Sequence, residues 1–171
     1  MTPRTLIDEP HIQQRVRELA GEISEDFADR EMIALCVLKG AVFFMADLVK
    51  AMDRDVAIDF LQVSSYGDAT ESSGVVTVLK EPQLDMHGKS VLIVEDIIDS
   101  GLTLREVHRY IRNRGADMVK VVALLDKRAA RKVDFDADYV GFEIEPLFVI
   151  GYGLDYGEKY RNLRDIRVLE G

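Results

Sequence analysis

Three acidic residues and a group of hydroxyls follow one apolar segment closely enough to act on a single ligand. Residues 91–94 read Val-Leu-Ile-Val, which predicts a strand buried on both faces. Glu95, Asp96 and Asp99 come next, and the stretch 100–103, Ser-Gly-Leu-Thr, opens a helical pattern. Because the first N–H groups of a helix and its dipole favour an anion, we predict that this junction binds a phosphate.

Carboxylates beside a phosphate would repel it unless the ligand keeps the two apart. A ligand with a phosphate at one end and sugar hydroxyls or a metal ion at the other would resolve this conflict. The alternative is an acidic loop between a strand and a capped helix.

Size and composition predict one soluble domain over residues 1–171, with 47% hydrophobic and 31% charged residues. No stretch approaches the ~20 apolar residues of a membrane span, and the N-terminus lacks the apolar core of a secretory signal. The single cysteine, Cys36, lies in an apolar run, so we expect a core residue and a cytoplasmic protein.

Net charge limits the partners. A charge of −9 disfavours broad binding to nucleic acid or to an anionic membrane, because both need a positive field. A local basic patch stays possible, although solvated helix and loop faces are the simpler interpretation. Its residues would be Arg105, Arg109, Arg112, Arg114, Arg128, Arg131 and Lys132.

The hydrophobic pattern predicts alternating strands and helices. Helices are expected at 10–28, at about 41–52 and at about 101–113, the last ended by Gly115. Strands are expected at Met32–Leu38, Val56–Ser64, Val75–Leu79, 90–95, Val119–Leu125, Tyr139–Phe142 and Phe148–Ile150, with a mixed tail from Gly151 onward. This alternation implies an α/β fold with a mostly parallel central sheet flanked by helices.

Ligands of such sheets bind beyond the carboxyl ends of the strands. Three segments come directly after apolar strands: 39–40, 95–103 and 126–127. We therefore expect these three segments to converge on one site.

The segment 91–104 resembles the phosphoribosyl pyrophosphate (PRPP) motif of the type I phosphoribosyltransferases, with its apolar strand, paired acids and Asp-Ser-Gly-x-Thr. More segments are similar to the short bacterial hypoxanthine-guanine phosphoribosyltransferase family: Leu38-Lys39-Gly40, Ser65-Tyr66-Gly67, Asp126-Lys127-Arg128, 141–156 and 158–163. The resemblance implies a small hood built from the N- and C-terminal segments. It also implies purine salvage, in which PRPP and hypoxanthine, with guanine as a second acceptor, give IMP or GMP and pyrophosphate.

The resemblance assigns the PRPP contacts to the 95–103 segment. Glu95 and Asp96 would face the ribose hydroxyls, directly or through Mg²⁺. Asp99 would take the N7 proton of the purine, unless it only caps the helix or orients the loop. The 5′-phosphate would bind at Ser100, Gly101, Leu102 and Thr103, although Thr103 could be a plain helix hydroxyl.

The purine contacts are assigned to residues further along the chain. The ammonium of Lys127 would bind the purine O6, which adenine lacks, unless it is an exposed loop lysine. Phe148 would stack on the base, and Val149 would read its edge through the main chain. Without the family match, core packing would be the simpler interpretation of Phe148.

Pyrophosphate would bind at Lys39, Gly40 and Arg161, and in this family the Leu38–Lys39 peptide is often cis. Asp155 would hold a second Mg²⁺ through water. For Asp155 and Arg161 the alternative is a surface charge. Ser65 and Tyr66 would begin a loop, 65–74, that closes over the site.

Three other functions are compatible with such a sheet. They are an RNA-binding regulator, a type I transferase with another acceptor, and a dinucleotide oxidoreductase. No Gly-x-Gly-x-x-Gly follows the first predicted strand, which weighs against the last of these. The resemblance suggests a homodimer or homotetramer, and the sequence does not rank hypoxanthine, guanine and xanthine as substrates.

Overall fold

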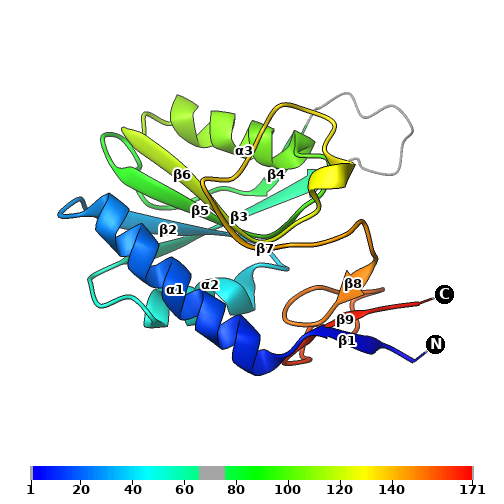
Figure 1. The fold of residues 1–171 in the computed structure, drawn as a ribbon. Coiled ribbons are helices and arrows are strands. Elements are labelled where there is room, and N and C mark those ends of the chain that lie inside the picture. Colours follow the sequence, from blue (N-terminus) through cyan, green and yellow to red (C-terminus); the bar gives the residue numbers. More distant parts are fainter. Residues whose placement is uncertain (1, 66–75, 171) are drawn as a thin grey trace.

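A six-stranded sheet with helices on both faces forms the body of the molecule (Figure 1). The computed structural model describes residues 2–65 and 76–170. Strands β2, β3, β5, β6 and β7 run parallel, and β4 is antiparallel to β3, which confirms the predicted mostly parallel sheet. In spatial order the strands are β4 (Val76–Lys80), β3 (Ala57–Ser65), β2 (Met32–Val37), β5 (Ser90–Ile98), β6 (Met118–Asp126) and β7 (Tyr139–Glu143).

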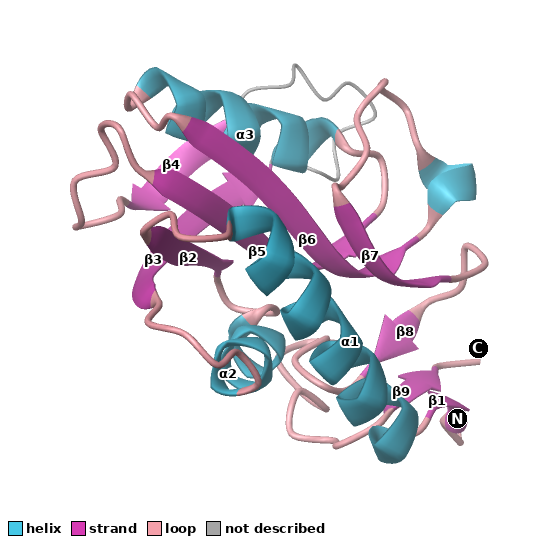
Figure 2. Cartoon of the chain, turned by 60° about the vertical axis from the view of Figure 1, so that its left-hand side comes forward, coloured by secondary structure: helices cyan, strands magenta, loops and turns pink. Residues whose placement is uncertain are grey.

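The helices form one layer on each face of this sheet. Helices α1 (Glu9–Phe27) and α2 (Val42–Lys50) cover one face, and α3 (Leu102–Asn113) covers the other (Figure 2). Strand β2 is buried along its whole length, and its side chains alternate between the two layers. Met32, Ala34 and Cys36 join the apolar cluster on the side of α1 and α2, whereas Ile33, Leu35 and Val37 join the cluster under α3.

Helix α1 matches its prediction closely. The Asp8 carboxylate accepts a hydrogen bond from the His11 N–H at 3.0 Å and so caps the helix, and Pro10 occupies the first turn. The predicted stripe is confirmed, because each of its residues is at most 1% exposed. They are Ile12, Val16, Leu19, Ile23 and Phe27.

The two ends of the chain pair in a second sheet, the hood, which confirms that part of the prediction. It consists of β1 (Arg4–Ile7), β9 (Ile166–Val168) and β8 (Val149–Ile150), all antiparallel, with both termini beside it (Figure 1). The predicted strand at 148–150 is therefore an edge strand of the hood. Strands β1 and β9 are too short, at four and three residues, for their periodicity to reveal them.

The strand of the acidic motif is longer than predicted. Its pairing with β6 continues to Ile98, opposite Asp126, so Glu95 and Asp96 lie within β5 and only Asp99 follows it. Cys36 is fully buried, as predicted for a core residue, and burial raises the pKa of its thiol to about 12. Within the described part of the chain, no helix is long and apolar enough to cross a membrane.

Candidate active site

The three predicted segments meet at the carboxyl ends of β2, β5 and β6. The Lys127 N–H donates to the Ile98 carbonyl at 2.9 Å, and Lys127 Nζ lies 3.1 Å from Asp99 Oδ1. A Cβ on Gly40 would lie 1.8 Å from Asp96 Oδ2, so the main chain after β2 lies against the carboxylate on β5. The predicted convergence is confirmed.

A fourth segment, from the tail, closes this arrangement. A Cβ on Gly153 would lie 2.0 Å from the Gly40 carbonyl oxygen, and Gly153 has φ +99°. Only glycine fits this backbone conformation and this close approach without strain.

The predicted phosphate loop ends in a sharp turn. Gly101 is the N-cap of α3 with φ +84°, and the Leu102 N–H donates to Ser100 Oγ at 3.3 Å. Thr103 lies in the first turn of α3. The first helical hydrogen bond runs from the Arg105 N–H to the Gly101 carbonyl at 3.0 Å. The N–H groups before Arg105 therefore lie at the helix start, where an anion would bind.

Glu95 and Asp96 are partly buried neighbours that fold back on the main chain. Glu95 Oε1 accepts from the Asp96 N–H at 2.9 Å, and Asp96 Oδ1 accepts from the Ile97 N–H at 2.8 Å. Burial raises the pKa of Glu95 well above its ordinary value, and the nearby carboxylate of Asp96 raises it further. Among the described residues, no group of three or more His, Cys, Asp or Glu side chains is arranged to hold a metal ion.

Two of the predicted pyrophosphate residues, Lys39 and Arg161, lie around one acid, Glu158. Lys39 Nζ is 3.1 Å from Glu158 Oε2, and Arg161 Nη2 donates to Glu158 Oε1 at 2.9 Å. Arg161 Nη1 also donates to the Gly153 carbonyl at 2.7 Å and lies 3.3 Å from Asp155 Oδ1. Arg161 is thus a partly buried, multiply paired side chain and no free surface charge. The Leu38–Lys39 peptide is cis.

Phe148 and Val149 lie at the edge of the hood with different exposure. Phe148 is 50% exposed, and its ring meets that of Tyr156 edge-on at 5.7 Å between centroids. Core packing, the alternative for Phe148, is therefore wrong. Val149 is buried in β8. Of the predicted closing loop, Ser65 ends β3, whereas Tyr66 and the rest of the loop lie outside the described residues.

Comparison with known proteins agrees with this geometry. Residues 4–157 match the family described as the phosphoribosyl transferase domain. The hypoxanthine-guanine phosphoribosyltransferase of Bacillus subtilis is 50% identical over 98% of this chain and 93% of its own length. The chain belongs to the hypoxanthine-guanine phosphoribosyltransferase family. The Aquifex aeolicus member of this family is 46% identical over 98% of this chain and 94% of its own length.

Solved structures of the hypoxanthine-guanine phosphoribosyltransferase family have the same fold. A Bacillus anthracis member superposes with a TM-score of 0.95 at 45% identity, covering 99% of this chain and 100% of that one. Family membership excludes the dinucleotide oxidoreductase alternative.

The prediction of a solvated face is wrong for Arg131. Its side chain is only 12% exposed, and Nη2 lies 2.7 Å from Oδ1 of the buried Asp126. Arg131 Nη1 also donates to the Asp99 carbonyl at 3.0 Å. No sequence signal distinguishes Arg131 from its basic neighbours, because its burial depends on the packing of the loop after β6.

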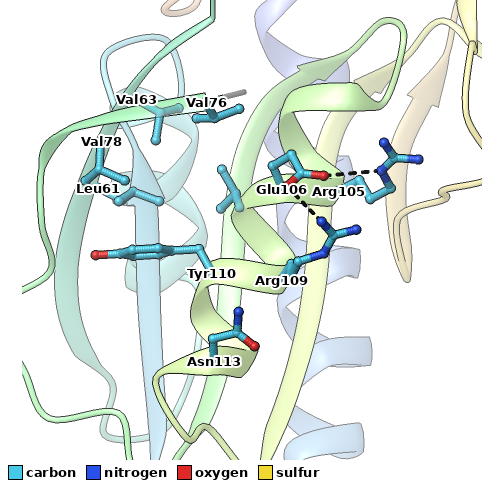
Figure 3. A pocket seen from close by; sticks show the side chains of 10 residues that line it. Leu61, Val63, Val76, Val78, Arg105, Glu106, Arg109, Tyr110 and Asn113 are labelled. Atoms are coloured by element: carbon cyan, nitrogen blue, oxygen red, sulfur yellow. Dashed lines mark hydrogen bonds and ion pairs between the residues drawn. The ribbon is translucent and has the colours of Figure 1, made fainter. Parts of the chain in front are cut away.

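The arginines of α3 have a different environment, shown in Figure 3. A hollow of about 540 Å³ lies between α3 and the β3–β4 pair, and none of the predicted site residues lines it. Arg105 and Arg109 lie 3.5 and 3.2 Å from the carboxylate of Glu106, and their side chains are 38% and 62% exposed. The interpretation as a solvated face therefore holds for Arg109, whereas Arg105 is partly buried. The hollow is lined by Leu61, Val63, Val76, Val78, Arg105, Glu106, Val107, Arg109, Tyr110 and Asn113.

Proposed function

We propose that this chain transfers the phosphoribosyl group of PRPP to hypoxanthine and to guanine, forming IMP or GMP and pyrophosphate. The observation that carries the proposal is the pair of Lys127 and Asp99, 3.1 Å apart at the carboxyl ends of β6 and β5. A 6-oxopurine presents an acceptor, O6, and a protonated N7 along one edge. An ammonium beside a carboxylate is complementary to that edge.

Asp99 supplies the proton acceptor in this proposal. As the base attacks through N9, its N7 proton must leave, and a carboxylate within hydrogen-bond distance accepts it. The Asp99 side chain is 56% exposed and so accessible to a base. Binding of the base would separate Asp99 from Lys127. Asp99 would then contact N7 of the purine, and Lys127 would contact O6.

Lys127 supplies the specificity. Its side chain is only 13% exposed, so an ammonium facing a group that cannot accept a hydrogen bond would lose solvation without compensation. The 6-amino group of adenine is such a group. Mismatches of this kind discriminate by ~10⁴–10⁵-fold.

The hood offers two kinds of contact to a base, a ring that can stack on its face and main-chain groups that can bind its edge. The half-exposed ring of Phe148 offers a stacking surface, which is worth ~1–3 kcal/mol for a base. The Leu169 N–H donates to the Phe148 carbonyl at 3.0 Å, so a hydrogen-bonded pair lies directly beside the Val149–Val168 pair of the β8–β9 ladder. Bonded and non-bonded pairs alternate in antiparallel sheets, so the main-chain groups of Val149 point away from β9. They are available to the edge of the purine.

PRPP would bind along the segment from Glu95 to Thr103. Main-chain N–H groups at the start of α3 and the Ser100 and Thr103 hydroxyls would hold the 5′-phosphate. Glu95 and Asp96 would face the ribose hydroxyls and place negative charge near the sugar carbon, which becomes positive as its bond to pyrophosphate breaks.

The carboxylates also suit Mg²⁺, a hard cation that prefers oxygen ligands and keeps several waters. Burial and then the carboxylate of Asp96 raise the pKa of Glu95, and a cation beside the pair would favour its charged form. Mg²⁺, when bound, would neutralise charge on the pyrophosphate.

Lys39, Gly40 and Arg161 would bind the pyrophosphate as it leaves. Asp155 has both oxygens close to protein donors, the Glu158 N–H at 2.8 Å and Arg161 Nη1 at 3.3 Å. Because both oxygens already have protein donors, Asp155 would contact a second Mg²⁺ through water and not directly. Loop closure by Ser65 and Tyr66, a homodimer or homotetramer, and a cytoplasmic location stay predictions.

The test is pyrophosphate release with PRPP and Mg²⁺ for hypoxanthine, guanine, xanthine, adenine and uracil. We expect turnover with hypoxanthine and guanine, and at least ~10⁴-fold less kcat/KM with adenine. Lys127→Met should reduce this discrimination, whereas Lys50→Met, at the end of α2, should leave it unchanged. Comparable turnover of adenine and hypoxanthine by the unmodified protein would contradict the proposal.

A further inference from the structure

The main-chain carbonyls at the start of the phosphate loop are all held by protein donors. Four successive carbonyls, from Ile98 to Gly101, each accept a hydrogen bond from a protein group. The donors are the Lys127 N–H (2.9 Å), Arg131 Nη1 (3.0 Å), the Lys132 N–H (2.9 Å) and the Arg105 N–H (3.0 Å), in that order. With its carbonyls held by the protein, the loop presents N–H groups to a ligand. A phosphate therefore meets donors and is not repelled by carbonyl oxygens.

Three of these four donors belong to the segment that follows β6 and carries Lys127. This segment includes the 3₁₀ helix η1 (Arg128–Ala130) and ends in Arg131 and Lys132. It therefore connects the residue proposed to select the base with the loop proposed to bind the phosphate. Only the Asp99 carbonyl is held by a side chain, that of Arg131.

The guanidinium of Arg131 is fixed from several directions. Nη2 lies 2.7 Å from Asp126 Oδ1, whose side chain is 3% exposed, and 3.3 Å from Asp136 Oδ1. Arg131 Cδ lies against Gly101, so that a Cβ on Gly101 would lie 2.9 Å from it. A planar guanidinium can donate to a carboxylate and a carbonyl at once, whereas a lysine ammonium is a single point of charge.

We propose that Arg131 is a positioning residue that keeps the Asp99 carbonyl turned away from the phosphate site. Arg131 thereby sets the direction of the loop N–H groups and of the Asp99 side chain. The inference rests on the proposed function, because it takes the loop to bind a 5′-phosphate. Without Arg131 the Asp99 carbonyl would lose its one hydrogen-bond donor among the described residues, and nothing would then keep its oxygen away from the phosphate.

The experiment compares binding of IMP and of inosine by calorimetry. Inosine has the same base and ribose but no phosphate, so the ratio of the two affinities reports on the phosphate loop alone. For Arg131→Lys we expect IMP affinity to fall about tenfold or more, the equivalent of one hydrogen bond to a charged group. Inosine affinity should change by less than about twofold, and KM should rise for PRPP but not for hypoxanthine.

Arg128→Lys is the matched control. Arg128 lies in the same turn, but its side chain is 60% exposed and Nη2 is 3.7 Å from Asp136 Oδ1. Both affinities should match those of the unmodified protein. A parallel loss in Arg128→Lys would show that the turn as a whole matters and would overturn the assignment to Arg131.

Two further outcomes would overturn the proposal. Unchanged IMP affinity in Arg131→Lys would show that the Asp99 carbonyl needs no such support. Equal losses of IMP and inosine affinity would show general damage to the site. If Arg131→Lys does not fold, the experiment uses Asp126→Asn in its place. This variant should lose less affinity for IMP than Arg131→Lys and should keep its affinity for inosine. Failure of the proposed function is distinguishable, because the unmodified protein would then bind IMP no better than inosine.

Discussion

At the scale of single residues, the proposed chemistry depends on Asp99 and Lys127, whose Oδ1 and Nζ atoms lie 3.1 Å apart. The pair is asymmetric, with the lysine side chain 13% exposed and the aspartate side chain 56% exposed. We expect the accessible member to handle a proton and the buried member to recognise an atom of the base.

Replacing Asp99 tests the role in proton transfer. Asp99→Asn keeps the size of the side chain but cannot accept the N7 proton as a base. The single-turnover rate should therefore fall by ~10²–10⁴-fold. Asp134→Asn, at an exposed position beyond η1, is the control and should keep the normal rate. A nearly normal rate in Asp99→Asn would remove Asp99 from this role.

At the scale of elements, the turn from β5 into α3 determines where the phosphate would bind. Gly101 adopts φ +84°, and a Cβ there would lie 2.9 Å from Arg131 Cδ. Gly101→Ala should destabilise the fold by ~1–2 kcal/mol because an alanine is strained in the left-handed region. Urea denaturation measures this, and IMP binding should weaken in the same variant.

Gly21→Ala is the matched control for this prediction. Gly21 lies inside α1, and a Cβ there would meet no atom within 4 Å. Alanine is a better helix former than glycine, so this variant should gain ~0.5–1 kcal/mol in the free energy of unfolding. Equal stability of the two variants would contradict the argument from backbone conformation.

At the scale of the whole molecule, the hood and the main sheet share one apolar core. Val149, Ile166 and Val168 of the hood belong to the same buried cluster as Ile12 and Val16 of α1. We therefore propose that residues 1–171 fold as one domain. Thermal unfolding followed by far-UV and near-UV circular dichroism should give one coincident transition. Two separate transitions would show that the hood unfolds independently.

The hood also predicts a dependence of stability on pH. Partial burial would raise the pKa of Asp165, but hydrogen bonds from Arg167 (2.9 Å) and from Thr5 Oγ1 (3.1 Å) outweigh it and lower this pKa. A lowered carboxyl pKa stabilises the fold above the unfolded value of about 3.9, and this stabilisation is lost as pH falls through the folded value.

Asp165→Asn should therefore be less stable than the unmodified protein by about 1 kcal/mol at pH 7. The difference should shrink below about pH 4 and vanish once Asp165 is protonated in both states. Denaturation curves from pH 7 to pH 3 measure this, with the exposed Asp53→Asn as the control. A difference that does not change with pH would show that the carboxylate charge contributes nothing.

The local parts of the fold and site were predictable from the sequence. The stripe of α1, the two-sided burial of β2 and the strand–turn–helix around Asp99 are each encoded within a few consecutive residues, because helix and strand periodicities are local. The family resemblance extended this to Lys39, Lys127 and Arg161. Strand β5 is longer than its sequence pattern predicts, because the polar residues at its end pair with β6. The hydrophobic period of a single segment carries no information about such pairing.

The sequence alone therefore determined the alternation of strands and helices, the motif at the end of β5 and the family. Only the tertiary structure decided that Lys127 pairs with Asp99, that Arg131 is buried against Asp126, and that the two ends of the chain form the hood. The physical reason is that a side chain's burial and partners depend on segments far away in the sequence. The sequence around a buried arginine therefore does not differ from the sequence around a solvated one.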